Sequence, residues 1–337
     1  MECKTDFSLK ALNTFNVQAN AARYVRFDEP REIVDFMGRN PLGGRRCLVL
    51  GGGSNLLFVD DYDGTVLHPM LKGVEVVETG RRHIRLRAMA GENWDDLVAL
   101  TVANGWGGIE NLSLIPGSVG ASAVQNIGAY GVEVKDVIDR VEAISMDSLE
   151  NVTFAPADCG FGYRTSHFKD AWTGRFIITA VTFTLGRQPE LVLDYPGLRT
   201  AVDELGSRAL GTLRQAVIAI RQRKLPDPAV TGNAGSFFKN PVVDRRTLAG
   251  LQRVYPDVPH YPQGGDRFKL AAGWLIERCG WKGKQVGRAA VHDRQALVLV
   301  NLGGATGREI FELSEQVRGS VHARCGIELE REVLLVP

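Results

Sequence analysis

A single hydroxyl lies among glycines and aromatic residues in a short run that could carry proton transfer. Ser236 belongs to Gly-Asn-Ala-Gly-Ser-Phe-Phe-Lys-Asn-Pro (residues 232–241), which places a cation and an amide just downstream. Because glycine permits backbone conformations that side chains forbid, the two glycines predict a tightly shaped loop. Phe237 and Phe238 would anchor that loop to a core while Ser236 faces elsewhere. On spacing alone such a run is more often a packed glycine turn, so its chemistry depends on the rest of the chain.

Two further glycine-rich segments could cradle a ligand. The first, Gly51-Gly-Gly-Ser-Asn55, follows an apolar stretch, so successive backbone N–H groups could turn toward one anion. It lacks the spacing of a dinucleotide fingerprint or of a phosphate loop, and alone it is more often a turn. The second, residues 110–131, interleaves glycine with serine, glutamine and asparagine. Its small residues would let a large flat ligand approach the backbone, which favours a binding role over packing.

The composition limits the classes of protein to consider. A chain of 337 residues can form two or three domains, and a net charge of +1 gives no reason to expect nucleic acid or an anionic membrane as partner. The 5 cysteines are never spaced as C-x-x-C, which argues against a disulfide framework or a structural zinc and fits a reducing cytosol. No segment approaches the ~20 apolar residues of a membrane helix, and the first residues lack the apolar core of a signal peptide. We therefore expect a cytoplasmic protein without a metal site.

Periodicity and capping residues predict the elements that position these segments. Asn93 is a natural N-cap, Thr306-Gly-Arg-Glu309 forms a capping box, and Pro30 fits the first turn of a helix. Helices are predicted from residue 30 and over Trp94–Ala103, 213–223, Arg245–Val254, 270–278 and 306–325. Strands are predicted over 47–50, 56–60, 84–87, 176–185 and, from an alternation of apolar and acidic residues, 327–336. Pro226 and Pro228 break the chain and indicate a domain boundary nearby.

The motifs together resemble those of the UDP-N-acetylenolpyruvoylglucosamine reductase family. They are G-G-G-S-N-L-L, then I-P-G-S-V-G-A-S-A-V-Q-N-I-G-A-Y-G, then G-Y-R, then G-N-A-G-S-F-F-K-N-P. They follow the family's order from Asn13 to Glu332 and cover nearly the whole chain. Leu193-Asp-Tyr195 resembles the subgroup that carries an extra substrate-covering loop with a tyrosine.

The resemblance implies a fold and an activity. The expected fold class is α+β with three domains, two of which form an FAD-binding unit of the PCMH/vanillyl-alcohol-oxidase type while the third binds substrate. The expected boundaries are residues 1–70 with 326–337, then 71–222, then 223–325. The implied activity is reduction of the enolpyruvyl group of UDP-N-acetylglucosamine enolpyruvate to UDP-N-acetylmuramate, with non-covalent FAD as cofactor and NADPH as reductant. The expected partner is this small-molecule sugar nucleotide, and a monomer is expected.

The resemblance also implies roles for individual residues. Arg164, in G-Y-R, would hold the substrate carboxylate, Ser236 would donate the proton, and Glu332 would share the stabilisation of the enol. The flavin would contact Gly51, Gly52, Gly53, Ser54, Asn55, Leu56, Pro116, Gly117, Ser118, Gly120, Ala121, Gln125, Asn126, Gly128, Ala129 and Tyr130. The substrate would be anchored by Tyr163, Tyr195, Lys224, Asn240 and Gln295.

Several other residues could be taken for catalytic or cofactor-binding residues, but we expect them to be structural or solvated. Glu328 and Glu330 share a face and a charge with Glu332, but we expect them to be solvated or structural. His292 has no partner at a metal-ligand spacing, so we expect a hydrogen-bonded structural histidine. Trp274 and Trp281 are expected in the core rather than against a cofactor.

Three positions depart from the family pattern. Asn16 replaces a usual glycine, Ala123 replaces a frequent proline in the long flavin segment, and Arg331 replaces a frequent proline between two glutamates. Asparagine tolerates a left-handed backbone better than most residues, so the turn at Asn16 can survive. Two other functions stay open: a flavin oxidase of the same broad fold, and a sugar-nucleotide binding or sensing module without chemistry. A hydrolase is disfavoured because no G-x-S-x-G elbow surrounds a serine.

Overall fold

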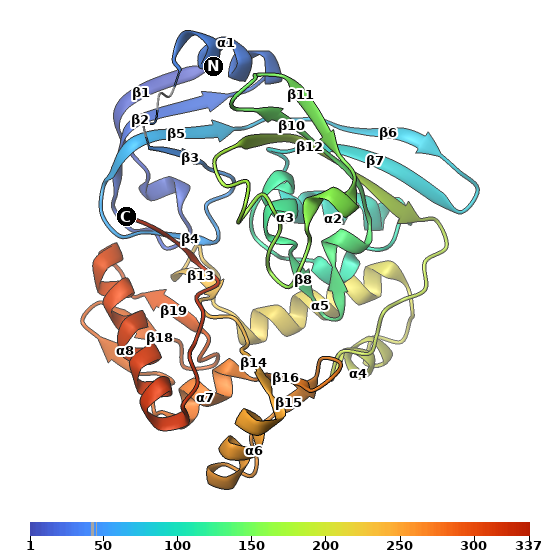
Figure 1. Cartoon of the computed structure of the whole chain (residues 1–337). Coiled ribbons are helices and arrows are strands. Elements are labelled where there is room, and N and C mark those ends of the chain that lie inside the picture. Colours follow the sequence, from blue (N-terminus) through green and yellow to red (C-terminus); the bar gives the residue numbers. More distant parts are fainter. Residues whose placement is uncertain (42–43, 45) are drawn as a thin grey trace. The chain divides into compact units, whose positions relative to one another are not determined.

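The computed structural model describes residues 1–41, 44 and 46–337 (Figure 1). The chain divides into two compact units, each built from several segments. Unit 1 comprises Met1–Phe7, Ala21–Gly52 and Asp63–Arg223. Unit 2 comprises Ser8–Asn20, Gly53–Tyr62 and Lys224–Pro337.

Unit 1 contains a four-stranded and a five-stranded sheet. The four-stranded sheet has the order β1-β2-β5-β3, formed by Glu2–Ser8, Asn20–Phe27, Tyr62–Pro69 and Cys47–Val49. The five-stranded sheet is antiparallel, with the order β11-β10-β12-β7-β6. Its strands are Asn151–Phe154, Ile138–Ser145, Phe176–Gly186, His83–Met89 and Val74–Thr79. The helices of unit 1 are α1 (Pro30–Arg39), α2 (Trp94–Ala103), α3 (Val119–Gln125), α4 (Leu198–Glu204) and α5 (Leu210–Lys224).

The main core of unit 1 lies between the five-stranded sheet and α2. Trp94, the first residue of α2, is 1% exposed and meets Phe183 of β12 edge to face at 5.9 Å. Its indole N–H donates to the carbonyl of Leu112 at 2.9 Å, which satisfies the polar end of an otherwise apolar side chain. The Asn93 side chain accepts from Asp96 N, so the predicted N-cap is confirmed and α2 starts where the cap requires.

Unit 2 is built around a four-stranded antiparallel sheet covered by α8. The sheet has the order β13-β19-β18-β17, formed by Gly232–Ser236, Val298–Asn301, Ala289–Val291 and Gln285–Val286. A three-stranded sheet (β14-β16-β15: Val242–Asp244, Arg267–Leu270, His260–Pro262) and a parallel pair (β4, Leu56–Phe58, with β20, Leu334–Val336) complete it. The helices are α6 (Arg245–Val254), α7 (Ala272–Arg278) and α8 (Gly307–Cys325). The predicted capping box of α8 is confirmed, because Thr306 and Glu309 bond to each other's backbone N–H groups.

The glycine-rich segment 110–131 contains helical structure that the sequence did not predict. Val119–Gln125 forms α3, and a short 3-10 turn spans Glu110–Leu112. Small side chains allow α3 to lie close to its neighbours, since a Cβ built on Gly120 would come within 2.8 Å of Ala90 Cβ. The glycines of this segment therefore serve helix packing as well as loop shape.

The run around Ser236 is partly a strand. Gly232–Ser236 is β13, and it pairs with β19 with an irregularity between Asn233 and Ser236. Gly235 has a φ of +67°, so the predicted glycine-dependent turn exists within this strand. Phe237 and Phe238 are 0% and 1% exposed, which confirms them as the anchors of the run.

The predicted strand over 327–336 is mostly wrong. Only Leu334–Val336 is a strand, although Ile327, Leu329 and Val333 are buried as the alternation predicts. Among the described residues, the backbone from 327 to 333 pairs with a neighbouring segment only through the isolated bridge between Arg331 and Phe238. It is also held by α8, because Arg318 Nε donates to Leu329 O at 3.0 Å. Figure 1 shows this C-terminal segment running beside α8.

Two negative findings concern the described part of the chain. None of its helices combines the length and the apolar character that crossing a membrane requires. It also contains no group of three or more His, Cys, Asp or Glu side chains that could hold a metal ion.

Candidate active site

In unit 1 the two glycine segments lie against each other. A Cβ built on Gly52 would lie 2.7 Å from Gly117 Cα, and one on Gly51 would lie 2.8 Å from Ser118 Oγ and 3.1 Å from Ala121 Cβ. Glycine is therefore required by this close approach. The contact brings predicted flavin residues that are more than sixty positions apart in the sequence into one cradle.

A buried histidine holds the start of this cradle. His68 is 6% exposed; its Nδ1 lies 2.8 Å from the Tyr24 hydroxyl, and the ring is also hydrogen-bonded to the backbone of Gly51. Burial lowers the pKa of His68 from 6.5 to about 4. The ring is thus neutral at physiological pH and bridges β2 and the triglycine turn.

The His68 environment predicts a loss of stability in mild acid. The pKa of His68 is lower in the folded protein than in the unfolded chain. On acidification the unfolded chain therefore binds a proton at this histidine that the native protein does not bind. The resulting loss begins near pH 6.5, grows by about 1.4 kcal/mol per pH unit and ends near pH 4. Urea unfolding at pH values from 7.5 to about 4.5 should show this slope in the wild type and a shallower one in His68→Gln. Equal slopes in the two proteins would contradict a neutral native His68.

Asn126 and Gly128 connect the flavin segment to the G-Y-R motif. Asn126 is 0% exposed, donates to Gly162 O at 2.8 Å and accepts from Lys135 N at 3.1 Å. Arg164 Nη2 donates to Gly128 O at 2.5 Å, and its guanidinium lies 5.2 Å from the centre of the Tyr163 ring. The structure therefore brings Tyr163 and the predicted catalytic arginine to the flavin segment.

Asn111 fixes the tyrosine loop beside the same segment. Its Nδ2 donates to Tyr130 O and to Val192 O, both at 2.9 Å. The rings of Tyr130 and Tyr195 then meet edge to face at 4.9 Å. Tyr195 is 39% exposed, so part of this residue remains accessible to a ligand.

Arg221 is a candidate functional residue that the motifs do not reveal. Its Nε is buried and has no hydrogen-bond partner within the described ranges, and burial lowers the pKa of its guanidinium despite the nearby Tyr130 and Asp95. Arg214, two turns earlier on α5, is fully engaged with Asp95 through bonds of 2.6 and 2.9 Å. The arginines' seven-residue spacing, which puts both on one helix face, is the sequence signal that could have identified Arg221.

Left-handed backbone is concentrated in the same segments of unit 1. Four residues that are not glycine, Leu114, Asn126, Tyr130 and Arg164, adopt φ values of 60°, 44°, 50° and 58°. Such a conformation costs about 1–2 kcal/mol for an ordinary residue and persists where the surroundings impose it. Clustering of this kind is typical of a functional site.

In unit 2, Asn55 joins the end of the triglycine segment to the C-terminal segment. Its Nδ2 donates to Glu332 O, and its carbonyl accepts from Leu334 N, both at 3.0 Å. Gly53 has a φ of +61°, and its carbonyl accepts from Thr14 N at 3.0 Å. Asn16 has a φ of +54°, so the expected left-handed turn without glycine is confirmed.

The segments of Ser236 and Glu332 are directly bonded. Glu332 N donates to Phe237 O at 2.9 Å, and Lys239 N donates to Glu330 O at 2.9 Å. Ser236 and Glu332 are both partly exposed, whereas Phe237, which follows Ser236 and bonds to Glu332, is buried. Of the predicted catalytic residues, unit 2 thus holds Ser236 and Glu332 on adjacent segments, and unit 1 holds Arg164.

The two neighbouring glutamates behave as structural residues. Glu330 Oε1 accepts from Lys239 Nζ at 2.5 Å, and Glu328 accepts from Arg318 at 2.5 Å. Lys239 is therefore committed to an ion pair rather than to the serine. The ion pairs of Glu328 and Glu330 are consistent with the structural role expected of them.

The predicted substrate residues of unit 2 border α7. Asn240 Oδ1 accepts from Ala272 N at 2.9 Å, and a Cβ built on Gly273 would lie 3.0 Å from Gln295 Oε1. His292 Nδ1 accepts from Arg294 N and Gln295 N at 3.3 Å, and burial lowers its pKa. His292 thus shapes the Gln295 turn, as expected of a structural histidine. Lys224, the last residue of α5, is exposed.

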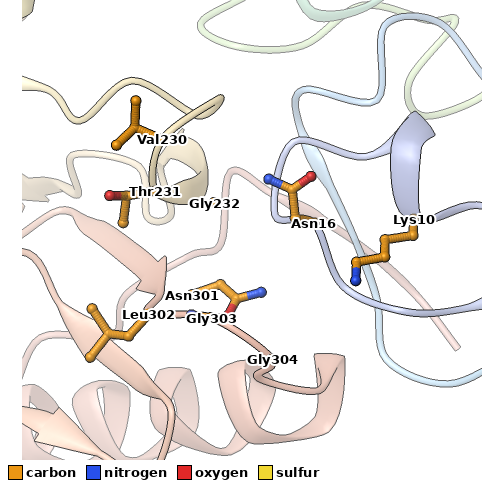
Figure 2. Close-up of a pocket in the computed structure, with 9 residues that line it drawn as sticks. All are labelled: Lys10, Asn16, Val230, Thr231, Gly232, Asn301, Leu302, Gly303 and Gly304. Atoms are coloured by element: carbon orange, nitrogen blue, oxygen red, sulfur yellow. Dashed lines mark hydrogen bonds between the residues drawn. The ribbon is translucent and has the colours of Figure 1, made fainter.

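A separate cavity of about 310 Å³ in unit 2 is lined by none of the residues predicted to be catalytic or to bind flavin or substrate. Figure 2 shows Lys10 and Asn16 on one side of it and Asn301 with Gly303 and Gly304 on another. The Asn301 amide is already used, because it donates to Phe15 O and accepts from Gly303 N and Ala305 N. We therefore do not include this cavity in the candidate active site.

The residues present in unit 1 fit a flavin. Buried polar atoms are normally hydrogen-bonded, yet Asn111 Oδ1 and Arg221 Nε have no partner in the described part of the chain. Both belong to residues around Tyr130, beside the glycine cradle that accepts close approach of a ligand to the backbone. A ring system with donors and acceptors along its edge would satisfy them.

Comparison with family models defines the class of protein. Residues 21–149 match a model described as an FAD binding domain. Residues 227–336 match a model described as the C-terminal domain of UDP-N-acetylenolpyruvoylglucosamine reductase. With its mixed sheets and helices and its glycine cradle, the protein is an FAD-binding oxidoreductase of the α+β class.

Comparison with curated proteins gives the family. The chain is 48% identical over 327 residues to the UDP-N-acetylenolpyruvoylglucosamine reductase of Bacteroides fragilis, covering 97% of this chain and 98% of that protein. The enzyme of the same name from Burkholderia mallei is 47% identical over 334 residues, covering 97% and 95%. The chain belongs to the UDP-N-acetylenolpyruvoylglucosamine reductase family, which confirms the resemblance drawn from the motifs.

A solved structure supports the fold. The UDP-N-acetylenolpyruvylglucosamine reductase of Thermus caldophilus superimposes with a TM-score of 0.67 at 24% identity, covering 100% of this chain and 98% of that one. The predicted α+β fold class is thereby confirmed. The roles of individual residues stay predictions.

Proposed function

We propose that this protein reduces the enolpyruvyl group of UDP-N-acetylglucosamine enolpyruvate to UDP-N-acetylmuramate, with FAD as cofactor and NADPH as reductant. This reaction belongs to peptidoglycan precursor synthesis. The observation that carries the proposal is the direct pairing of the Ser236 and Glu332 segments, through Phe237 O and Glu332 N, in a chain of this family. Binding alone requires neither a proton donor nor a partner for one.

The reaction adds a hydride to the terminal alkene carbon and a proton to the adjacent carbon. Bound FAD would supply the hydride that NADPH provides. As the hydride adds, negative charge develops on the adjacent carbon and its carboxylate. Arg164 is assigned to this charge, because a planar guanidinium can bind a carboxylate through two parallel hydrogen bonds, and its bond to Gly128 O orients it.

Ser236 is assigned to deliver the proton to the adjacent carbon. A serine hydroxyl is a weak acid, so the incipient alkoxide needs nearby donors and rapid reprotonation. Glu332 is assigned to share the stabilisation of the enol through a hydrogen bond to the substrate carboxylate. Its backbone is held at both its N–H and its C=O, which favours one direction for the side chain.

The remaining predicted residues would anchor the nucleotide. Lys224 and Tyr195 are assigned to the diphosphate because both are accessible and can donate hydrogen bonds. Asn240, Gln295 and Tyr163 are assigned to the rest of the substrate. The proposal includes a monomer that acts in the cytoplasm and three domains: residues 1–70 with 326–337, 71–222 and 223–325.

Steady-state oxidation of NADPH tests the proposed function. The purified protein should be yellow with non-covalent FAD, and NADPH should be consumed in proportion to the enolpyruvyl sugar nucleotide added. The product should gain two hydrogen atoms by mass. Rapid NADPH oxidation that requires oxygen and not the sugar nucleotide would identify an oxidase instead, and protein that takes up no flavin would contradict the proposal.

A further inference from the structure

Arg331 departs from the family pattern next to a predicted catalytic residue, and its contacts are all within unit 2. Its guanidinium forms an ion pair with Glu315, its Nε lies 3.3 Å from Ser314 Oγ, and its Cζ lies 5.3 Å from the centre of the Phe311 ring. All three partners lie on one face of α8, because Ser314 and Glu315 follow Phe311 by three and four residues. With its side chain 19% exposed, Arg331 is packed as well as paired.

The same face of α8 holds the preceding residues. Arg318 donates to Leu329 O at 3.0 Å and forms ion pairs with Glu328 at 2.5 Å and Glu315 at 2.9 Å. Glu315 is therefore shared by two guanidinium groups, one on the helix and one on the C-terminal segment. The segment is tied to α8 at both Leu329 and Arg331.

On its other side the segment pairs with the residues after Ser236. Arg331 and Phe238 form an isolated antiparallel bridge, whose two hydrogen bonds are Lys239 N to Glu330 O and Glu332 N to Phe237 O. Arg331 occupies the position of this bridge at which its own N–H makes no ladder bond. A proline, which the family resemblance leads us to expect at this position, would therefore be compatible with the same pairing.

Arg331 is fixed against α8 immediately before the chain bends at Glu332 and Val333. The contacts of Arg331 therefore restrain the backbone that carries the Glu332 side chain. The Glu332 backbone is also fixed, by Phe237 O and Asn55 Nδ2. The backbone that carries the Glu332 carboxylate is thus held by contacts that lie outside the reacting groups.

We infer that Arg331 is a positioning residue for Glu332: its guanidinium, held by Glu315, Ser314 and Phe311, restrains the segment that a proline would restrain by ring closure. This inference rests on the proposed function. It assigns to Arg331 a role that is specific to this chain and acts only through Glu332. Glu315 takes part in the same role, because it holds the Arg331 guanidinium.

Rapid-mixing kinetics of the two half-reactions test the inference. Arg331→Met should slow reoxidation of the reduced enzyme by the enolpyruvyl sugar nucleotide by roughly 10–100-fold and leave flavin reduction by NADPH unchanged. Glu315→Gln should reproduce part of this loss, and Arg331→Pro should recover part of it. Arg308→Met is the matched control, because Arg308 lies on the same helix but pairs with Asp60.

A double variant separates positioning from general stability. In a Glu332→Gln background, Arg331→Met should add less than about twofold, because its target is already lost. The inference would be overturned by additive losses in the double variant, by an equal slowing of both half-reactions, or by no effect of Arg331→Met. In each of these cases, turnover by the wild type would leave the proposed function intact. If Arg331→Met does not fold, Arg331→Lys, which keeps the charge but not the planar fork, is read by the same criteria. Failure of the wild type to reduce the sugar nucleotide would overturn both.

Discussion

Replacing Ser236 with alanine should slow reduction of the enolpyruvyl sugar nucleotide by roughly 10²–10⁴-fold, the range typical of a lost general acid. Flavin reduction by NADPH should be unaffected, because no proton from Ser236 enters that step. The substitution removes a single oxygen from a partly exposed position of β13, so we expect the fold to be preserved. The two half-reactions can be followed separately through the flavin absorbance.

The control for this prediction is Ser320→Ala, which removes a hydroxyl from α8 in the same unit. It should leave both half-reactions unchanged. Repeating the substrate half-reaction in deuterium oxide adds a second criterion, since the wild type should show a solvent isotope effect on the proton transfer. Normal turnover of Ser236→Ala would remove Ser236 from the mechanism and direct attention to Glu332 as the donor.

Replacing Arg164 with lysine should lower kcat/KM for the sugar nucleotide by roughly 10²–10³-fold, as expected when a donor aimed at developing charge is lost. Lysine keeps the positive charge but cannot offer two parallel N–H groups to a carboxylate. It also cannot bind Gly128 O and a substrate with the same geometry as the guanidinium does. Part of the loss should appear in kcat, because the interaction strengthens as charge develops.

Arg175→Lys is the matched control for this prediction. Arg175 also lies near an aromatic ring, with its Cζ 5.8 Å from the centre of the Phe176 ring, and it is not one of the predicted site residues. Arg175→Lys should leave kcat/KM unchanged, and added guanidinium ion should partly restore turnover to Arg164→Ala. A wild-type kcat/KM in Arg164→Lys would show that charge alone is sufficient at this position.

Capping residues in the sequence correctly predicted the helices whose ends are determined by residues at those ends. Asn93 and the Thr306–Glu309 box set the starts of α2 and α8, and the left-handed Gly326 ends α8. The strand predicted over 327–333 is wrong, because the alternation of buried and exposed residues in this segment arises from packing on α8 and not from a sheet. The helix α3 was missed because its small residues carry no strong periodic signal and are selected by close packing.

The candidate site was predictable where long motifs carry it. Ser236, Arg164 and the glycine segments follow from the family resemblance, and the structure adds the contacts that hold them. Arg221 and His68 could not be found in this way, since their significance depends on burial and on partners distant in the sequence. Arg331 appeared first as an irregularity of the pattern, and its contacts with α8 give it a physical meaning.

The left-handed residues of unit 1 have a consequence for attempts to make this protein more heat-resistant. Leu114, Tyr130 and Arg164 are among the positions where exchange for glycine would relieve backbone strain. At Tyr130 and Arg164 that exchange would also delete the side chains assigned to flavin and substrate. Gains in melting temperature obtained there should therefore come with loss of turnover, so stabilising changes are better sought elsewhere, such as at the surface of α6.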